Sequence, residues 1–192
     1  SLSIRWILLA SAAVGISTAH NLLKSEDVIS ALKAIKKLGI NYKKNGNEYE
    51  ISGQGLNGFN LKKNTVINSG NSGTLARLIL GLLVKTNQNI KIVGDKSLSK
   101  RDFSRVIIPL KKFGAEFFPK NRSTLPILIK GSNILRPINY HEKRGSAQCK
   151  SSIMYAALNT PGKTIIKAKK SRDHTEILFK NLNLPIKVKK DK

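Results

Sequence analysis

The chain has 192 residues, of which 40% are hydrophobic, so it is long enough to form a packed core in one or two domains. Its 35 basic and 11 acidic residues give a formal net charge of +24, which is typical of proteins with anionic partners. The single cysteine excludes an internal disulfide framework and a cysteine-based zinc cluster, and it favours a reducing, cytoplasmic environment.

The positive charge is not concentrated in any one motif. Only eight of the basic residues are arginines, the lysines are spread along the whole chain, and aromatic residues are not interleaved with them. A solvated lysine-rich surface is therefore the favoured interpretation, small anionic substrates come second, and nucleic acid comes third. The histidines, His20, His141 and His174, lack the spacing of metal ligands, so we expect no metal and no cofactor.

The first predicted element is a helix over residues 6–14, which follows the small polar residues Ser1 and Ser3. It is apolar on nearly every side, which is typical of a helix buried all round. The run is too short to span a bilayer, so no membrane segment is expected. A signal peptide is an alternative, but it is disfavoured because two similar runs recur at residues 74–84 and 147–158.

Each apolar helix is followed by a short β-branched strand and then by a polar cap that begins an amphipathic helix. The caps are KSED at 24–27, SKRD at 99–102 and KSRD at 170–173, in which Ser and Asp supply N-cap oxygens. In the first amphipathic helix Val28, Leu32 and Ile35 line one face, and glycine ends the first two helices at KKLG (36–39) and KKFG (111–114). Further short strands are predicted at 40–42, 49–53, 115–118, 126–130 and 185–189.

This order predicts an α/β chain of three repeated helix–strand–helix–strand–strand units. With an opening strand before the first helix, each unit has the order βαβαββ; the first unit lacks this opening strand. The units cover about residues 1–66, 67–138 and 139–192 and surround buried parallel helices, in a single, incomplete domain. Free N–H groups and the positive end of a helix favour anions. If the three buried helices begin on one face, their N-termini form a common anion-binding site.

Five collinear motifs resemble those of the 3-phosphoshikimate 1-carboxyvinyltransferases, also called 5-enolpyruvylshikimate-3-phosphate (EPSP) synthases. They are SLSIR, NSGNSGTLARLILG, GDKSLSKRDFSRVIIPLKKFGAEF, GSAQCKSSIMYAAL and SRDHTE. The resemblance implies one domain of a two-domain enolpyruvyl transferase. It implies transfer of the enolpyruvyl group of phosphoenolpyruvate to the 5-hydroxyl of shikimate 3-phosphate, with release of phosphate and without a metal. The alternatives are a basic nucleic-acid-binding protein and the related UDP-N-acetylglucosamine enolpyruvyltransferase.

The resemblance also implies two sets of substrate-binding residues. The set for shikimate 3-phosphate consists of Ser1, Arg5, Ser146, Ala147, Gln148, Ser171 and Arg172. The set for phosphoenolpyruvate consists of Asn71, Gly73, Thr74, Arg101 and Gln148. The acid and base groups of the family lie in its second domain, so no catalytic residue is assigned here. Without that domain, the chain is expected to be inactive.

The chemistry of several of these residues also favours a binding role. Arg5 precedes a buried run and needs an anion, Gln148 begins an apolar helix where its amide is hard to satisfy, and Gly73 permits close approach of a ligand. Arg77 is equally compatible with a structural role, and Cys149 is expected to be a buried hydrophobe rather than a nucleophile. Three further residues, Asp173, Glu176 and His174, are expected to be structural, the two acidic ones as helix caps. The chain departs from the family pattern at Ile4, Trp6 and Asp102.

Overall fold

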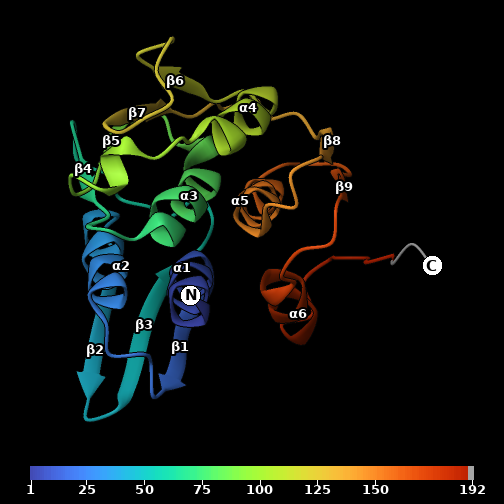
Figure 1. Cartoon of the computed structure of the whole chain (residues 1–192). Helices are drawn as coiled ribbons and strands as arrows, with labels where there is room; N and C mark the ends of the chain where they lie inside the picture. Colours follow the sequence, from blue (N-terminus) through green and yellow to red (C-terminus); the bar gives the residue numbers. More distant parts are fainter. Residues whose placement is uncertain (190–192) are drawn as a thin grey trace.

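Three helices with few polar residues lie side by side at the centre of the computed structural model, which describes residues 1–189 (Figure 1). They are α1 (Leu2–Ala12), α3 (Gly73–Leu82) and α5 (Ala147–Leu158). In α3 every residue except Thr74 is buried. The prediction of three buried helices is confirmed because a helix without a polar face is stable in water only when other elements cover it.

The bounds of the buried helices α1 and α3 differ from those predicted. The α1 helix ends at Ala12, and Val14, which was expected inside it, begins a strand and is 89% exposed. The β-branched residues Val14 and Ile16 suit an extended backbone, which here pairs with a later strand. After α3 the chain forms a 3₁₀ helix, η1 (Leu83–Lys85), rather than a further α-helical turn.

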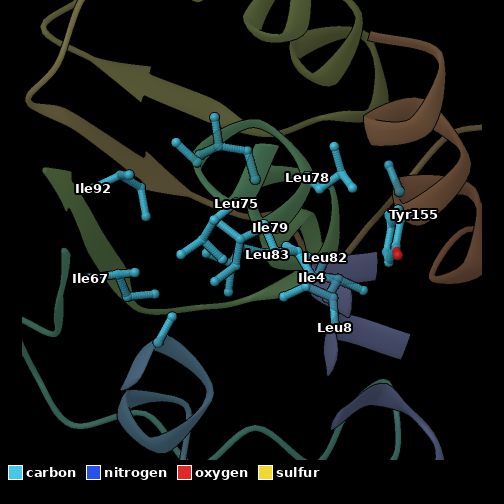
Figure 2. Close-up of a cluster of buried hydrophobic side chains, with 14 of the residues drawn as sticks. Ile4, Leu8, Ile67, Leu75, Leu78, Ile79, Leu82, Leu83, Ile92 and Tyr155 are labelled. Atoms are coloured by element: carbon cyan, nitrogen blue, oxygen red, sulfur yellow. The ribbon is translucent and has the colours of Figure 1, made fainter. Parts of the chain in front are cut away.

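The side chains of α3 form the middle of the hydrophobic core (Figure 2). Leu75, Leu78 and Ile79 of α3 are fully buried among residues of α1, α5 and the second sheet. Each such side chain contributes roughly 1.5–3 kcal/mol on burial. Ile4 of α1 is also fully buried in this core, so its departure from the family pattern affects packing, and Trp6 packs against the core while partly exposed.

Three amphipathic helices lie outside the central group: α2 (Glu26–Lys37), α4 (Ser104–Phe113) and α6 (His174–Asn181). The predicted side-chain cap is correct for α2, where the Ser25 hydroxyl accepts from the Val28 N–H. In α4 the N-cap is Phe103, and the Asp102 carboxylate one residue earlier accepts from the Ser104 N–H at 2.9 Å. In α6 Asp173 occupies the N-cap without a side-chain hydrogen bond, so the predicted caps of α4 and α6 were wrong.

The strands form three separate sheets around these helices (Figure 1). In the first sheet, β1 (Val14–His20), β3 (Glu48–Gln54) and β2 (Asn41–Asn45) are antiparallel neighbours. The second sheet has the order β4 (Val66–Asn68), β5 (Asn89–Val93), β7 (Ile127–Lys130), β6 (Glu116–Phe118), with β4 parallel to β5. In the third sheet β8 (Asn139–Glu142) is parallel to β9 (Ile165–Ala168).

The sheets follow one plan, which confirms the α/β fold class. Each buried helix is followed by a strand (β1, β5, β9), with η1 between α3 and β5, and the second and third sheets also have an opening strand before that helix (β4, β8). Another short 3₁₀ helix, η2 (Leu98–Lys100), precedes α4. The strand predicted at 185–189 was wrong, because these residues form no strand. None of the helices within residues 1–189 is long and apolar enough to cross a membrane.

Candidate anion-binding site

The first turns of α1, α3 and α5 are joined by side-chain hydrogen bonds. Gln148 in the first turn of α5 donates from Nε2 to the Thr74 hydroxyl of α3 at 3.2 Å. Arg5 of α1 donates from Nη2 to the Ser151 hydroxyl of α5 at 3.3 Å. The helix N-termini therefore lie together, as the repeated sequence pattern predicted, and their unpaired N–H groups and positive ends add at one place.

The first part of this arrangement, the Arg5 site, consists of Arg5, Ser1, Ser151 and Thr175. The Arg5 guanidinium donates to the Thr175 hydroxyl at 2.7 Å and to the hydroxyls of Ser1 and Ser151, and the side chain is only 3% exposed. Burial lowers the pKa of Arg5, an effect that the nearby Tyr155 and Glu176 oppose. Within residues 1–189 no carboxylate lies within ion-pair distance of this guanidinium, so its direct side-chain partners are hydroxyl groups.

An ion pair beside the Arg5 site connects α5 to α6. Lys150 pairs with one carboxylate oxygen of Glu176, and both side chains are largely buried. The second carboxylate oxygen of Glu176 is buried without a hydrogen-bond partner among the described residues. Glu176 was expected to cap its helix; it instead holds α6 against α5, because an unpaired carboxylate is costly at this depth.

Two further predicted residues, Ser171 and Arg172, lie in the segment just before α6. Arg172 is exposed, and its charge contributes to lowering the pKa of Arg5. The Ser171 hydroxyl and the Nδ1 atom of His174 are buried without a protein partner among residues 1–189. Since buried polar groups are normally hydrogen-bonded, this region has unused capacity for hydrogen bonds to a ligand or to water.

The second part, the Arg77 site, consists of Arg77, Gln148, Thr74, Gly73 and the backbone of Asp102. Arg77 donates from Nη1 to Gln148 Oε1 at 2.9 Å and from Nη2 to the Asp102 carbonyl at 3.2 Å. Its side chain is 5% exposed. Burial, together with repulsion from Arg105 and Arg101, lowers the pKa of Arg77 to about 10. The Gln148 carbonyl oxygen and one of its two N–H groups thus have protein partners, and its second N–H has none among the described residues.

Gly73 leaves room for the Arg77 side chain, a role that the sequence did not reveal. A Cβ atom on Gly73 would lie 2.7 Å from Arg77 Nη1 and 3.3 Å from Arg101 Nη1. The first distance is shorter than a normal contact, so a larger residue would displace the Arg77 side chain. The absence of a side chain at residue 73 therefore allows two guanidinium groups to approach the N-terminus of α3.

Arg101 is held at the edge of the site by a chain of hydrogen bonds. It donates to Asn71 Oδ1 at 3.1 Å, and Asn71 donates in turn to Asp95 Oδ2 at 2.6 Å. The hydrogen bond from Asn71 and that from the Leu98 N–H lower the pKa of Asp95. Asn71 thus bridges the cationic and anionic side chains, and the exposed guanidinium of Arg101 keeps N–H groups for a ligand.

At the start of α5, Ser146 and Ala147 form the N-cap and the first helical residue. The Ser146 hydroxyl accepts from the Cys149 N–H at 3.2 Å, and its own N–H donates to buried Glu142 at 2.8 Å. Cys149 is 1% exposed, and burial raises its pKa to about 12. A thiol with this pKa remains protonated at neutral pH, which agrees with the predicted buried hydrophobe. No group of three or more potential metal-ligating side chains occurs within residues 1–189.

Several residues that organise the site were not predicted from the sequence: Asp95, Lys150, Ser151, Tyr155 and Thr175. Ser151 and Lys150 were detectable in principle, because each places a polar group inside the apolar run 147–158. Tyr155 is fully buried in the same helix and donates to the Arg5 carbonyl at 2.9 Å. Their partners lie in distant segments, so no local pattern identified them.

Comparison with known proteins finds similarity to a single enzyme family. A family model described as EPSP synthase (3-phosphoshikimate 1-carboxyvinyltransferase) matches residues 1–192. Over 193 residues the chain is 42% identical to the 3-phosphoshikimate 1-carboxyvinyltransferase of Ruthia magnifica subsp. Calyptogena magnifica, covering 100% of this chain and 44% of that protein. The corresponding protein of Streptococcus mutans is 40% identical over 182 residues, covering 94% of this chain and 42% of that protein.

A solved structure gives the same result for the fold. The EPSP synthase of Acinetobacter baumannii superposes with a TM-score of 0.90 at 31% sequence identity. The match covers 98% of this chain and 43% of that protein. The chain therefore spans less than half the length of the relatives it matches.

Proposed function

The chain belongs to the EPSP synthase family, and we propose on this premise that it forms one domain of a 3-phosphoshikimate 1-carboxyvinyltransferase. The complete protein would transfer the enolpyruvyl group of phosphoenolpyruvate to the 5-hydroxyl of shikimate 3-phosphate and release phosphate. The observation that supports this most directly is the convergence of three buried helix N-termini on two buried arginines, Arg5 and Arg77, that lack carboxylate partners among the described residues. Both substrates are multiply anionic and suit such a site.

The two parts of the site fit the two substrates. We assign shikimate 3-phosphate to the side formed by the Arg5 site and the beginnings of α5 and α6, which contributes Ser1, Arg5, Ser146, Ala147, Gln148, Ser171 and Arg172. We assign phosphoenolpyruvate to the side formed by Asn71, Gly73, Thr74 and Arg101, with Gln148 between them. The planar guanidinium of Arg101 matches a carboxylate or phosphate group.

We propose that the described domain is one incomplete domain, with units at about residues 1–66, 67–138 and 139–192. A second domain of the same enzyme would close over the site and supply the groups that move protons. The chain by itself is then a binding half without turnover. We also propose that it acts in the cytoplasm, where its single buried cysteine stays reduced.

The test is a calorimetric titration of the 192-residue chain with shikimate 3-phosphate, which measures the dissociation constant. Gln148→Ala is expected to weaken binding by roughly tenfold, which corresponds to the loss of one hydrogen bond to a charged group. Lys63→Ala, a change at an exposed lysine, is the matched control and should leave binding unchanged. Equal effects of both variants on shikimate 3-phosphate binding would contradict the proposal. If the chain instead binds nucleic acid, with an affinity that falls steeply as the salt concentration rises, the alternative of a basic nucleic-acid-binding protein is supported.

A second measurement tests whether turnover needs the proposed second domain. In a phosphate-release assay with both substrates, residues 1–192 alone are expected to show no turnover. Full activity of the chain alone would contradict the assignment of the proton-transfer groups to a second domain.

A further inference from the structure

Arg77 contacts three separate segments of the chain through one guanidinium group. It donates to the Gly73 carbonyl of its own helix, to Gln148 Oε1 on α5, and to the Asp102 carbonyl in the loop that carries Arg101. The guanidinium also lies over the Phe103 ring, 4.7 Å from its centroid. A planar group with several donors suits this position, because a lysine ammonium cannot reach three acceptors in such different directions.

The contact with Arg77 decides which way the Gln148 amide points. An arginine side chain has only N–H donors, so the atom of Gln148 that faces it must be the carbonyl oxygen. The NH₂ group then faces Thr74, whose hydroxyl accepts one of its two N–H bonds. The second N–H has no protein partner among the described residues, and the Gln148 side chain is only half-buried.

We propose that Arg77 is a positioning residue, which holds the Gln148 amide with its NH₂ group free to donate to an anionic ligand and holds the loop that carries Arg101. This inference rests on the proposed function, since it concerns the same binding site. If the amide turned over, its NH₂ group would face the guanidinium and its carbonyl oxygen would face the ligand. Both contacts would then be unfavourable, because donor would meet donor and oxygen would meet an anion.

The first test measures the amide directly and needs no ligand. In the unmodified chain, NMR of the Gln148 side-chain amide should show one N–H proton protected from exchange by its bond to Thr74. Arg77→Lys should remove this protection, while Arg122→Lys, a change at an exposed arginine, should preserve it. An unchanged Gln148 amide in Arg77→Lys would overturn the inference, whatever the chain binds.

The second test is a double-mutant cycle on the affinity for shikimate 3-phosphate. If Arg77 acts through Gln148, Arg77→Lys weakens binding by roughly tenfold in the unmodified chain and by less than about twofold in the Gln148→Ala background. Tenfold losses in both backgrounds would mean that Arg77 acts independently of Gln148 and would overturn the inference. If the unmodified chain binds no shikimate 3-phosphate, the proposed function fails, and the amide measurement alone decides the role of Arg77.

A third variant keeps the inference testable if Arg77→Lys does not fold. Gln148→Glu retains an oxygen for Arg77 but replaces the NH₂ group with a second oxygen. It should raise the melting temperature by forming an ion pair with Arg77 and should weaken shikimate 3-phosphate binding by more than about tenfold. A lowered melting temperature, or unchanged binding, would contradict the proposed orientation of the amide.

Discussion

The Arg5 site and the Arg77 site each contain one buried arginine, but the groups around the two guanidiniums differ. Arg5 is surrounded by three hydroxyl groups that bond to it, and the Lys150–Glu176 ion pair lies beside it. Arg77 bonds to one amide oxygen and to backbone carbonyls, its Nε atom is buried without a partner among residues 1–189, and two other arginines repel it. The Arg5 site is therefore expected to contribute to stability, and the Arg77 site to reduce stability in favour of ligand binding.

Removing the ion pair beside Arg5 should give the largest effect. Lys150→Met leaves the largely buried Glu176 carboxylate unpaired and should lower the free energy of unfolding by about 3 kcal/mol, measured by urea denaturation. The matched control is Lys130→Met, whose partner Glu116 lies 4.0 Å away with both side chains about half exposed, 51% and 56%. A control effect as large as that of Lys150→Met would show that burial is not the cause.

Replacing each buried arginine by methionine tests the contrast itself. Arg5→Met should cost about 2 kcal/mol, because the Ser1 hydroxyl and its neighbours lose a charged partner. Arg77→Met should change the free energy of unfolding by less than about 1 kcal/mol, because it also removes a buried charge and its repulsion. The two unfolding curves can be compared in one buffer. Equal losses would mean that the two sites contribute alike to stability.

The hydroxyl of Tyr155 provides a smaller test of the Arg5 side. Tyr155→Phe removes its hydrogen bond to the Arg5 carbonyl but keeps the edge-to-face contact with Phe179, so stability should fall by about 1 kcal/mol. Tyr42→Phe serves as the control, since Tyr42 is partly exposed and should be replaceable within about 0.5 kcal/mol. Thermal denaturation of both variants gives the comparison. No loss in Tyr155→Phe would exclude a stabilising role for this bond.

The smallest effect on stability is expected at Gly73, next to Arg77. Gly73 is the first residue of α3, so Gly73→Ala gains less than the roughly 1 kcal/mol of helix propensity that applies in a helix interior, and it displaces Arg77. The net change should stay within about 0.5 kcal/mol. Its effect on function should be larger: the Gln148 amide should lose its exchange protection and binding of shikimate 3-phosphate should weaken by roughly tenfold. If binding is preserved, the site tolerates the displaced Arg77. Gly81→Ala is unsuitable as a control, because a Cβ there would lie 2.2 Å from the Ser152 carbonyl oxygen.

Much of the fold was predictable because its signals are local. The three apolar runs became buried helices, and the glycines at 39 and 114 end helices with φ of 82° and 115°. At residues 185–189 the local pattern predicted a strand that the structure does not have. They occupy the same place in the repeat as β2 and β6, each of which pairs only with the strand that follows it, β3 or β7. Residues 185–189 pair with no strand of the described chain, although Ile186 and Val188 favour an extended backbone.

The candidate site was predictable only in part. Its location followed from the small polar residues before each buried helix, and Gln148 and Arg101 lie there beside Gly73 and Thr74. The role of Arg77 did not follow from the sequence, because its contact with Gln148 joins residues 71 positions apart. The pairing of Lys150 with Glu176 across two helices was hidden for the same reason.

The sequence by itself determined which helices are buried, where most strands lie and which family the chain belongs to. These depend on hydrophobic periodicity, on turn residues and on short motifs, which neighbouring residues specify. Only the tertiary structure decided which polar groups satisfy one another: Arg5 with three hydroxyls, and Arg77 with Gln148. The physical reason is that a buried polar group is stable only with a partner, and that partner is set by how the three units stack.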